Sequence, residues 1–193
     1  IRSAAEDSAL LLVYYVGHGF GYQEPGELPR HYLQVRDSEE WAVDAPHGRG
    51  FDPYQVILEA RKHYRGQLTG LALMVDACNA SYAVKVVGSW GSPDMEYRTA
   101  WMGSSRQELA YDGCFTRELT ALLEGGVPKD RHPQSSLLTH LRVTDLAALL
   151  DNRCVGQKPV TGGFQTHDPA MYVAANRAAH EAITRLGLSA QEG

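Results

Sequence analysis

Three features are missing from this sequence, and each absence narrows the class of protein. No apolar run approaches the roughly 20 residues that a membrane-spanning helix needs, and no signal peptide is visible. No run of Lys and Arg occurs and the formal net charge is -5, which argues against nucleic-acid binding. We therefore expect neither a membrane nor a nucleic acid as a direct partner.

Cysteine is also scarce. The chain has three, Cys78, Cys114 and Cys154, widely spaced and without a CxxC pair. An odd, sparse set of cysteines is more typical of a reducing compartment than of a disulfide framework. We expect a cytoplasmic protein in which Cys114 and Cys154 are unpaired and behave as small buried hydrophobic residues.

No metal or cofactor site is expected. Apart from His18, the histidines show no metal-ligand spacing and should mostly lie at the surface. They are His31, His47, His63, His132, His140, His167 and His180. The glycines at 17, 19 and 21 imitate a phosphate-binding loop, but no helix opens directly after them, which argues against a nucleotide cradle.

The 193 residues fit a single domain, and the pattern of apolar residues alternates between strand and helix. The run at 10–16 is apolar on both faces, as expected of a central parallel strand. This alternation predicts an α/β fold with a sheet covered on both faces. The expected strands lie at 10–16, 32–35, 71–75, 98–102 and 171–173, the helices at 52–64, 115–124, 146–150 and 178–186, and 83–87 is ambiguous.

Two of these strands end in a reactive residue. The run at 10–16 leads directly into Gly17-His18-Gly19, and the run at 71–75 leads into Asp76-Ala77-Cys78. In a mostly parallel sheet, ligands bind beyond the carboxyl ends of the strands. Neighbouring strands would therefore bring an imidazole and a thiol together, which is the pairing of a cysteine nucleophile with its acid/base partner.

These residues resemble the motifs of the caspase and metacaspase superfamily. The segment 14–19 (YYVGHG) looks like its strand-plus-histidine motif, and 75–80 (VDACNA) looks like its nucleophile motif. His18 precedes Cys78 by 60 positions (78 − 18 = 60), close to the roughly 50 of caspases. Segments 110–116 and 156–159 resemble later parts of bacterial members, so that the likeness covers residues 8–178, ahead of a C-terminal helix and tail at 179–193.

The resemblance implies a caspase-like three-layer α/β/α sandwich with a mostly parallel central sheet, and a cysteine endopeptidase activity. Cys78 would attack the scissile carbonyl, and His18 would protonate the leaving amine and activate the deacylating water. Backbone N–H groups of Gly19 and Cys78 would form the oxyanion hole. In metacaspase-like members, an acid two positions before the nucleophile lines the S1 pocket, which assigns Asp76 to selection of Arg or Lys. A second S1 acid is not identifiable.

The resemblance also implies partners. The family fold has a strand and helices ahead of the histidine strand, whereas about nine residues precede Leu10 here. We expect an N-terminal fragment of the same fold, either truncated or separated by autoprocessing, and a regulatory domain or activator protein. The chain would then act on protein or peptide substrates as an activated effector peptidase, for example in bacterial immunity.

Several alternatives remain open from the sequence. The chain could be a catalytically silent scaffold that binds protein partners through the same groove, or a separase-like or gingipain-like cysteine peptidase with the same His-before-Cys order. Asp76 could instead cap a turn or a helix. Ser104, Ser105 and Tyr111 either border the substrate groove, because they follow a strand end, or serve only packing.

Overall fold

A computed structural model describes residues 6–7, 9–22, 25–26, 30–35, 50–64, 67–81, 98–105, 109–110, 113–130, 134–164 and 171–186. The strands within these ranges are β1 (Leu10–Val16), β2 (Gly19–Tyr22), β3 (Arg30–Gln34), β4 (Gly50–Phe51), β5 (Gly70–Asp76), β6 (Thr99–Gly103), β7 (His140–Arg142), β8 (Val160–Phe164) and β9 (Tyr172–Ala175). The helices are α2 (Tyr54–Tyr64), α4 (Cys114–Gly125), α5 (Val143–Leu150) and α6 (Arg177–Arg185), with a 3-10 turn η2 (Ser135–Leu137).

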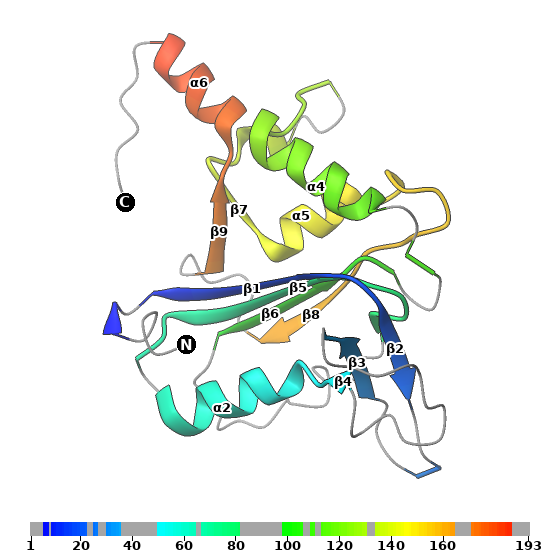
Figure 1. The fold of residues 1–193 in the computed structure, drawn as a ribbon. Helices are drawn as coiled ribbons and strands as arrows, with labels where there is room; N and C mark the ends of the chain where they lie inside the picture. The colour runs from blue at the N-terminus through cyan, green and yellow to red at the C-terminus, as the bar shows by residue number, and fades with distance from the viewer. Residues whose placement is uncertain are drawn as a thin grey trace.

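The main sheet of the described residues has the strand order β1-β5-β6-β8 (Figure 1). β1 and β6 both run parallel to β5, and β8 runs antiparallel to β6. Every residue of β5 is buried, in accordance with the continuous apolar sequence expected of a strand covered on both faces. The fold is therefore a mixed α/β arrangement around a mostly parallel sheet.

Helices lie on both faces of this sheet, with α4 and α5 on one side and α2 on the other (Figure 1). Met74 and Met102 face the first side and share a buried cluster with Phe115 and Leu119 of α4. On the opposite face, Trp101 belongs to a second cluster, against which Val56 of α2 packs. The alternation of side chains along each strand thus gives the sheet two apolar faces, each of which packs against a different set of helices.

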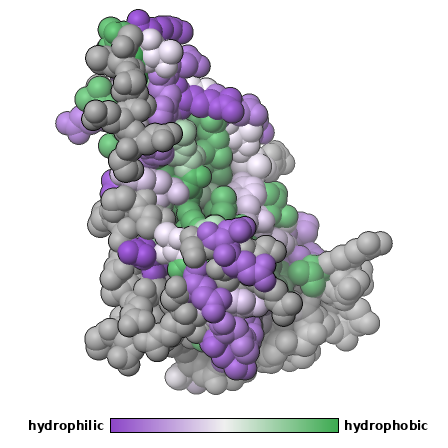
Figure 2. Space-filling model, turned by 90° about the vertical axis from the view of Figure 1, so that its left-hand side faces the viewer, coloured by the Kyte–Doolittle hydropathy of each residue, from purple (hydrophilic) through white to green (hydrophobic). Residues whose placement is uncertain are grey.

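β1 differs from its prediction as a central strand. It is an edge strand of the described sheet, and Leu12, Tyr14 and Val16 are 46%, 40% and 52% exposed. A continuous apolar run could not reveal this position, because it reflects the chain's composition and not which neighbours the strand has. Figure 2, which faces the left-hand side of Figure 1, shows apolar surface between the upper helices and the sheet. There, a hollow of about 140 Å³ is lined by Leu12, Leu119, Leu123 and other side chains.

Most predicted elements are confirmed, whereas the strands β2, β4, β7 and β8 were not predicted. The predicted strand at 32–35 is the second strand of a small antiparallel sheet of order β2-β3-β4. A further pair, β7 with β9, lies on the α4/α5 side. α5 begins three residues earlier than predicted, at Val143, where Asp145 and Arg142 form a capping box. The ambiguous segment 83–87 lies outside the described residues.

The expectation of unpaired Cys114 and Cys154 is wrong. The two cysteines form a disulfide that joins the first residue of α4 to the loop after α5. They are 40 residues apart in sequence, and tertiary packing alone brings their Cα atoms to 5.9 Å. Cys78 remains as the free cysteine of the chain. The scarcity of cysteine was therefore a poor guide to pairing, because a single disulfide needs only two of them.

No helix in the described ranges is both long enough and apolar enough to cross a membrane.

Candidate active site

The candidate site is built where β1 and β5 end. These strands pair in parallel with Leu10 opposite Gly70 and Val16 opposite Asp76. The paired strand ends Val16 and Asp76 are 60 residues apart in sequence (76 − 16 = 60), and so are His18 and Cys78. Each of the two candidate residues therefore stands two positions beyond the end of its strand. Adjacent strands are about 4.8 Å apart, so both chains leave the sheet side by side.

Gly19 shows how closely the two strand ends approach each other. A Cβ added to this glycine would lie 2.8 Å from the Cβ of Ala77 and 3.0 Å from the carbonyl oxygen of Cys78. Such contacts leave no room for a side chain, so glycine is required for the backbones to meet. Gly19 and Cys78, the two predicted contributors to an oxyanion hole, are thus brought together, while their role in binding an oxyanion stays a prediction.

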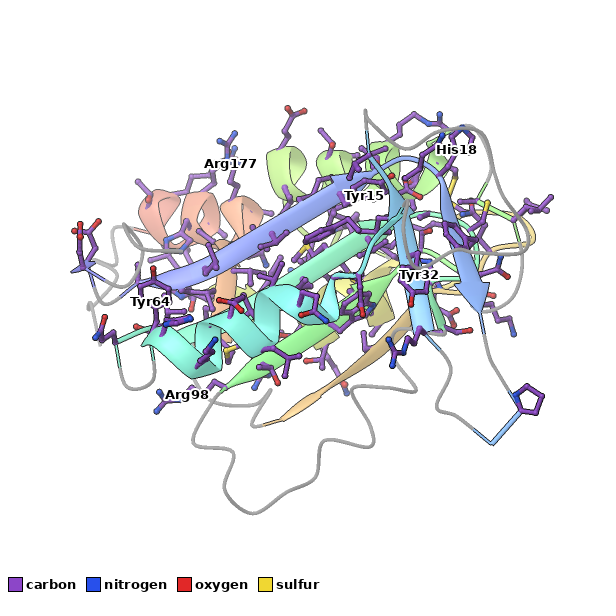
Figure 3. The ribbon with its side chains drawn as sticks, turned by 60° about the horizontal axis from the view of Figure 1, so that its bottom comes forward. Tyr15, His18, Tyr32, Tyr64, Arg98 and Arg177 are labelled. Atoms are coloured by element: carbon purple, nitrogen blue, oxygen red, sulfur yellow. A yellow bond between two sulfur atoms is a disulfide. The ribbon has the colours of Figure 1, made fainter. Side chains whose placement is uncertain are left out.

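The side chain of His18 is exposed and lies at the bend between β1 and β2 (Figure 3). Its backbone is held firmly, because its carbonyl oxygen accepts a hydrogen bond from the N–H of Gln34 at 2.9 Å. The Tyr15 hydroxyl lies 2.9 Å from the same carbonyl and 2.6 Å from that of Gln34. Gly17 donates its N–H to the carbonyl of Asp76 at 3.1 Å, which ties this bend to the end of β5.

Cys78 lies in a tight turn, and the residue before it, Ala77, is anchored by the two residues that follow β6. The hydroxyl of Ser104 accepts the N–H of Ala77 at 3.1 Å, and Ser105 donates its hydroxyl to the Ala77 carbonyl at 3.2 Å. Both serines are fully buried, so they support the turn that carries Cys78 and do not border a groove. Asn79, directly after the cysteine, has a φ of 58°, in the left-handed region that non-glycine residues rarely adopt.

The sulfur of Cys78 has a hydrogen-bond donor directed at it. The N–H of Ala110 lies 3.3 Å from Sγ, and the cysteine is partly buried. A backbone N–H in this position suits a sulfur that carries negative charge, as a thiolate nucleophile does. The donor lies just ahead of segment 111–112, so the predicted groove residue Tyr111 falls outside the described residues.

Asp76 is only 4% exposed and is held by α4. Its Oδ2 accepts the N–H of Thr116 at 3.1 Å and the Thr116 hydroxyl at 2.6 Å. Gly113, the N-cap residue of α4, has no side-chain cap to offer. The carboxylate from β5 therefore satisfies a first-turn N–H of the helix and lies at its positive end. This is the capping role that competes with the S1 role in the sequence.

Tyr14 extends this contact towards the surface. Its hydroxyl lies 2.9 Å from Oγ1 of Thr116 and donates to it, because the Thr116 proton is already directed at Asp76. Burial raises the pKa of Tyr14 above its ordinary value, the charge of Asp76 adds to this rise, and the hydrogen bond to Thr116 opposes it. The carboxylate is thus linked through Thr116 to a half-exposed phenol at the edge of the sheet.

His31 is the site residue that the sequence missed, since it was expected at the surface. It is 2% exposed, and its Nε2 lies 2.9 Å from the carbonyl oxygen of Cys78. Burial lowers its pKa from 6.5 to about 4, against the opposing effect of that hydrogen bond. Its position depends on the pairing of β2 with β3, where His31 stands opposite Gly21. Only a correct prediction of that hairpin would have signalled it.

Among the residues that the structure describes, no group of three or more His, Cys, Asp or Glu side chains could hold a metal ion. Comparison of the chain with protein-family models, with curated proteins and with solved structures finds no match in any of the three.

Proposed function

We propose that this chain is a caspase-like cysteine endopeptidase that cleaves proteins after Arg or Lys through a Cys78–His18 dyad. The observation that carries the proposal is the matched placement of His18 and Cys78 beyond the paired ends of β1 and β5. A free thiol with an N–H directed at its sulfur, together with an exposed imidazole beyond the end of the adjacent strand, is the minimal apparatus of a cysteine peptidase.

In the proposed mechanism, the Cys78 thiolate attacks the scissile carbonyl carbon, and the carbonyl π electrons move onto its oxygen. Collapse of this tetrahedral species expels the amine, which takes a proton from the His18 imidazolium. Neutral His18 then removes a proton from water, the resulting hydroxide equivalent attacks the thioester, and Cys78 leaves. The exposure of His18 gives this water access to the site. Backbone N–H groups of Gly19 and Cys78 would stabilise both oxyanions.

The preference for Arg or Lys rests on Asp76. Its carboxylate lies two residues before the nucleophile, where it would face the side chain of the residue ahead of the cleaved bond. The two hydrogen bonds from Thr116 both end on Oδ2 and hold the carboxylate in one orientation. A carboxylate is the natural partner of a guanidinium or ammonium group, and Asp76, which is 4% exposed, would serve it in addition to capping α4.

The proposal includes a partner along the edge of β1. The apolar side chains of Leu12, Tyr14 and Val16 are exposed there, next to the apolar hollow against α4. An N-terminal fragment of the same fold, separated by autoprocessing after a basic residue, would cover this edge, and a regulatory domain or activator protein would control it. We propose a cytoplasmic location, in which the Cys114–Cys154 disulfide would be reversible rather than permanent.

Cleavage of paired fluorogenic peptides ending in Arg, Lys or Asp tests the function. We expect the wild-type protein to cleave after Arg or Lys, and the Cys78→Ala variant to be inactive while its circular dichroism spectrum is unchanged. Asp76→Asn should lose cleavage after Arg and Lys. Cleavage after Asp by the wild type would keep the nucleophile but overturn the assignment of Asp76. Activity that survives Cys78→Ala would overturn the dyad.

A further inference from the structure

His31 is an unusual residue to find beneath a nucleophile turn. It is almost fully buried, and its Nδ1 has no hydrogen-bond partner among the described residues. An apolar side chain would fill this position without the free energy lost when a polar nitrogen is buried unsatisfied. A hydrogen bond that an apolar side chain could not make therefore indicates a role for this histidine.

That contact is with the nucleophile residue itself. Nε2 lies 2.9 Å from the carbonyl oxygen of Cys78, and a carbonyl can only accept, so Nε2 carries the proton. The same Nε2 lies 2.7 Å from the position that a Cβ on Gly19 would occupy. His31 is thus wedged between the two strand ends that bring His18 and Cys78 together.

We propose that His31 is a positioning residue for Cys78: its Nε2–H holds the Cys78 carbonyl and so fixes the direction in which the thiol leaves the turn. The purpose assigned to this contact rests on the proposed peptidase function. Its test does not, because the test measures the reactivity of the Cys78 thiol directly. The turn needs such a restraint because Asn79 is left-handed, with a φ of 58°. Strained residues of this kind persist only where surrounding contacts hold them.

The neighbouring contacts show what His31 adds. Ser104 and Ser105 fix the backbone of Ala77, on the strand side of the nucleophile. Ala110 contacts the sulfur alone. Among the described residues, it is His31 that donates to the Cys78 carbonyl. Loss of that hydrogen bond would remove a restraint on the peptide plane between Cys78 and Asn79, and with it a restraint on the direction of the thiol.

The test compares two substitutions at this position. His31→Gln keeps an N–H donor at a similar reach, whereas His31→Leu keeps the bulk and removes the donor. The readout is the rate at which iodoacetamide alkylates Cys78, followed by mass spectrometry, since the other two cysteines are in the disulfide. His63→Leu, at an exposed histidine of α2, is the matched control. Urea titration confirms that each variant is folded under the labelling conditions.

We expect His31→Leu to alkylate about fivefold to tenfold more slowly than wild type, in line with the loss of one hydrogen bond, and His31→Gln to restore most of the rate. In peptide cleavage, kcat should fall while KM is unchanged. A folded His31→Leu protein that reacts at the wild-type rate overturns the proposal, as does a His31→Gln protein that is no faster than His31→Leu. If the wild type cleaves no peptide but the alkylation pattern holds, the peptidase function fails and the positioning contact stands.

A second measurement needs no variant and decides the matter if His31→Leu does not fold. Nitrogen NMR of the wild-type protein reports which ring nitrogen carries the proton. We expect the Nε2–H tautomer for His31, with a proton that exchanges slowly with water because the group is buried. An Nδ1–H tautomer is incompatible with donation to the Cys78 carbonyl and would overturn the proposal.

Discussion

Loss of the Cys114–Cys154 disulfide should lower the free energy of unfolding by about 4 kcal/mol. The cross-link closes a loop of 40 residues. In the chain-entropy treatment, removing a cross-link across a loop of this length raises the conformational entropy of the unfolded chain by about 13 cal/mol/K. At 25 °C this corresponds to about 4 kcal/mol of lost stability. In the native state, the bond joins the first residue of α4 to a loop that contains the buried Cys154.

Urea unfolding of the wild type and of the Cys114→Ala/Cys154→Ala double variant measures this difference. The Cys78→Ala variant is the control, because it changes one cysteine and leaves the disulfide intact. Alkylation of the unreduced, denatured wild type should add one label, at Cys78, and after reduction three. A stability difference below about 1 kcal/mol, or three labels before reduction, would refute the reasoning. Because Cys114 lies two residues before Thr116, the variant should also loosen the contact with Asp76.

Three further predictions concern separate parts of the chain. Because the pKa of buried His31 is lowered from 6.5 to about 4, stability that is fully present above pH 6.5 should be lost as the pH falls towards 4, by roughly 3 kcal/mol. Urea midpoints across this range should fall less in His31→Gln than in wild type, and parallel curves would contradict the assignment. Thr116→Val removes the hydroxyl that donates to Asp76 and should cost about 1.5–3 kcal/mol, whereas Thr120→Val at an exposed site of the same helix should cost little. Equal losses in urea unfolding would show that the hydroxyl contributes nothing. Val16→Lys, on the exposed edge of β1, should change stability by at most about 0.5 kcal/mol but reduce self-association through this edge in sedimentation velocity. Leu137→Lys, at another exposed apolar residue, is its control, and identical association by the two variants would argue against pairing at β1.

The sequence was most informative where local pattern and tertiary burial agree. The apolar run of β5 and the helical spacing of Phe115, Leu119 and Leu122 each require burial on their own, so they were recognisable without knowledge of their neighbours. His18 and Cys78 were found in the same way, because each directly follows such a run. Their matched position followed only once β1 and β5 were paired in the observed register.

The contacts that the sequence could not supply are long-range ones. Nothing near Cys114 in sequence points to Cys154, 40 residues away. The cap that Asp76 provides for α4 joins residues 40 positions apart, and His31 reaches Cys78 across 47. Each of these contacts depends on which elements are neighbours in space. Short strands such as β2 and β4 have too few residues for their pairing with β3 to be predicted from the sequence pattern.

The central claim is that Cys78 and His18 act together on a substrate with a basic side chain. Its most direct test is labelling by an arginine-based electrophile, with the adduct located by mass spectrometry, in wild type and in His18→Ala. We predict an adduct on Cys78. It should form at least tenfold more slowly in His18→Ala than in the wild type. In the wild type it should form faster with the arginine-based electrophile than with an aspartate-based one. Equal rates in the two proteins, or an adduct elsewhere in the chain, would contradict it.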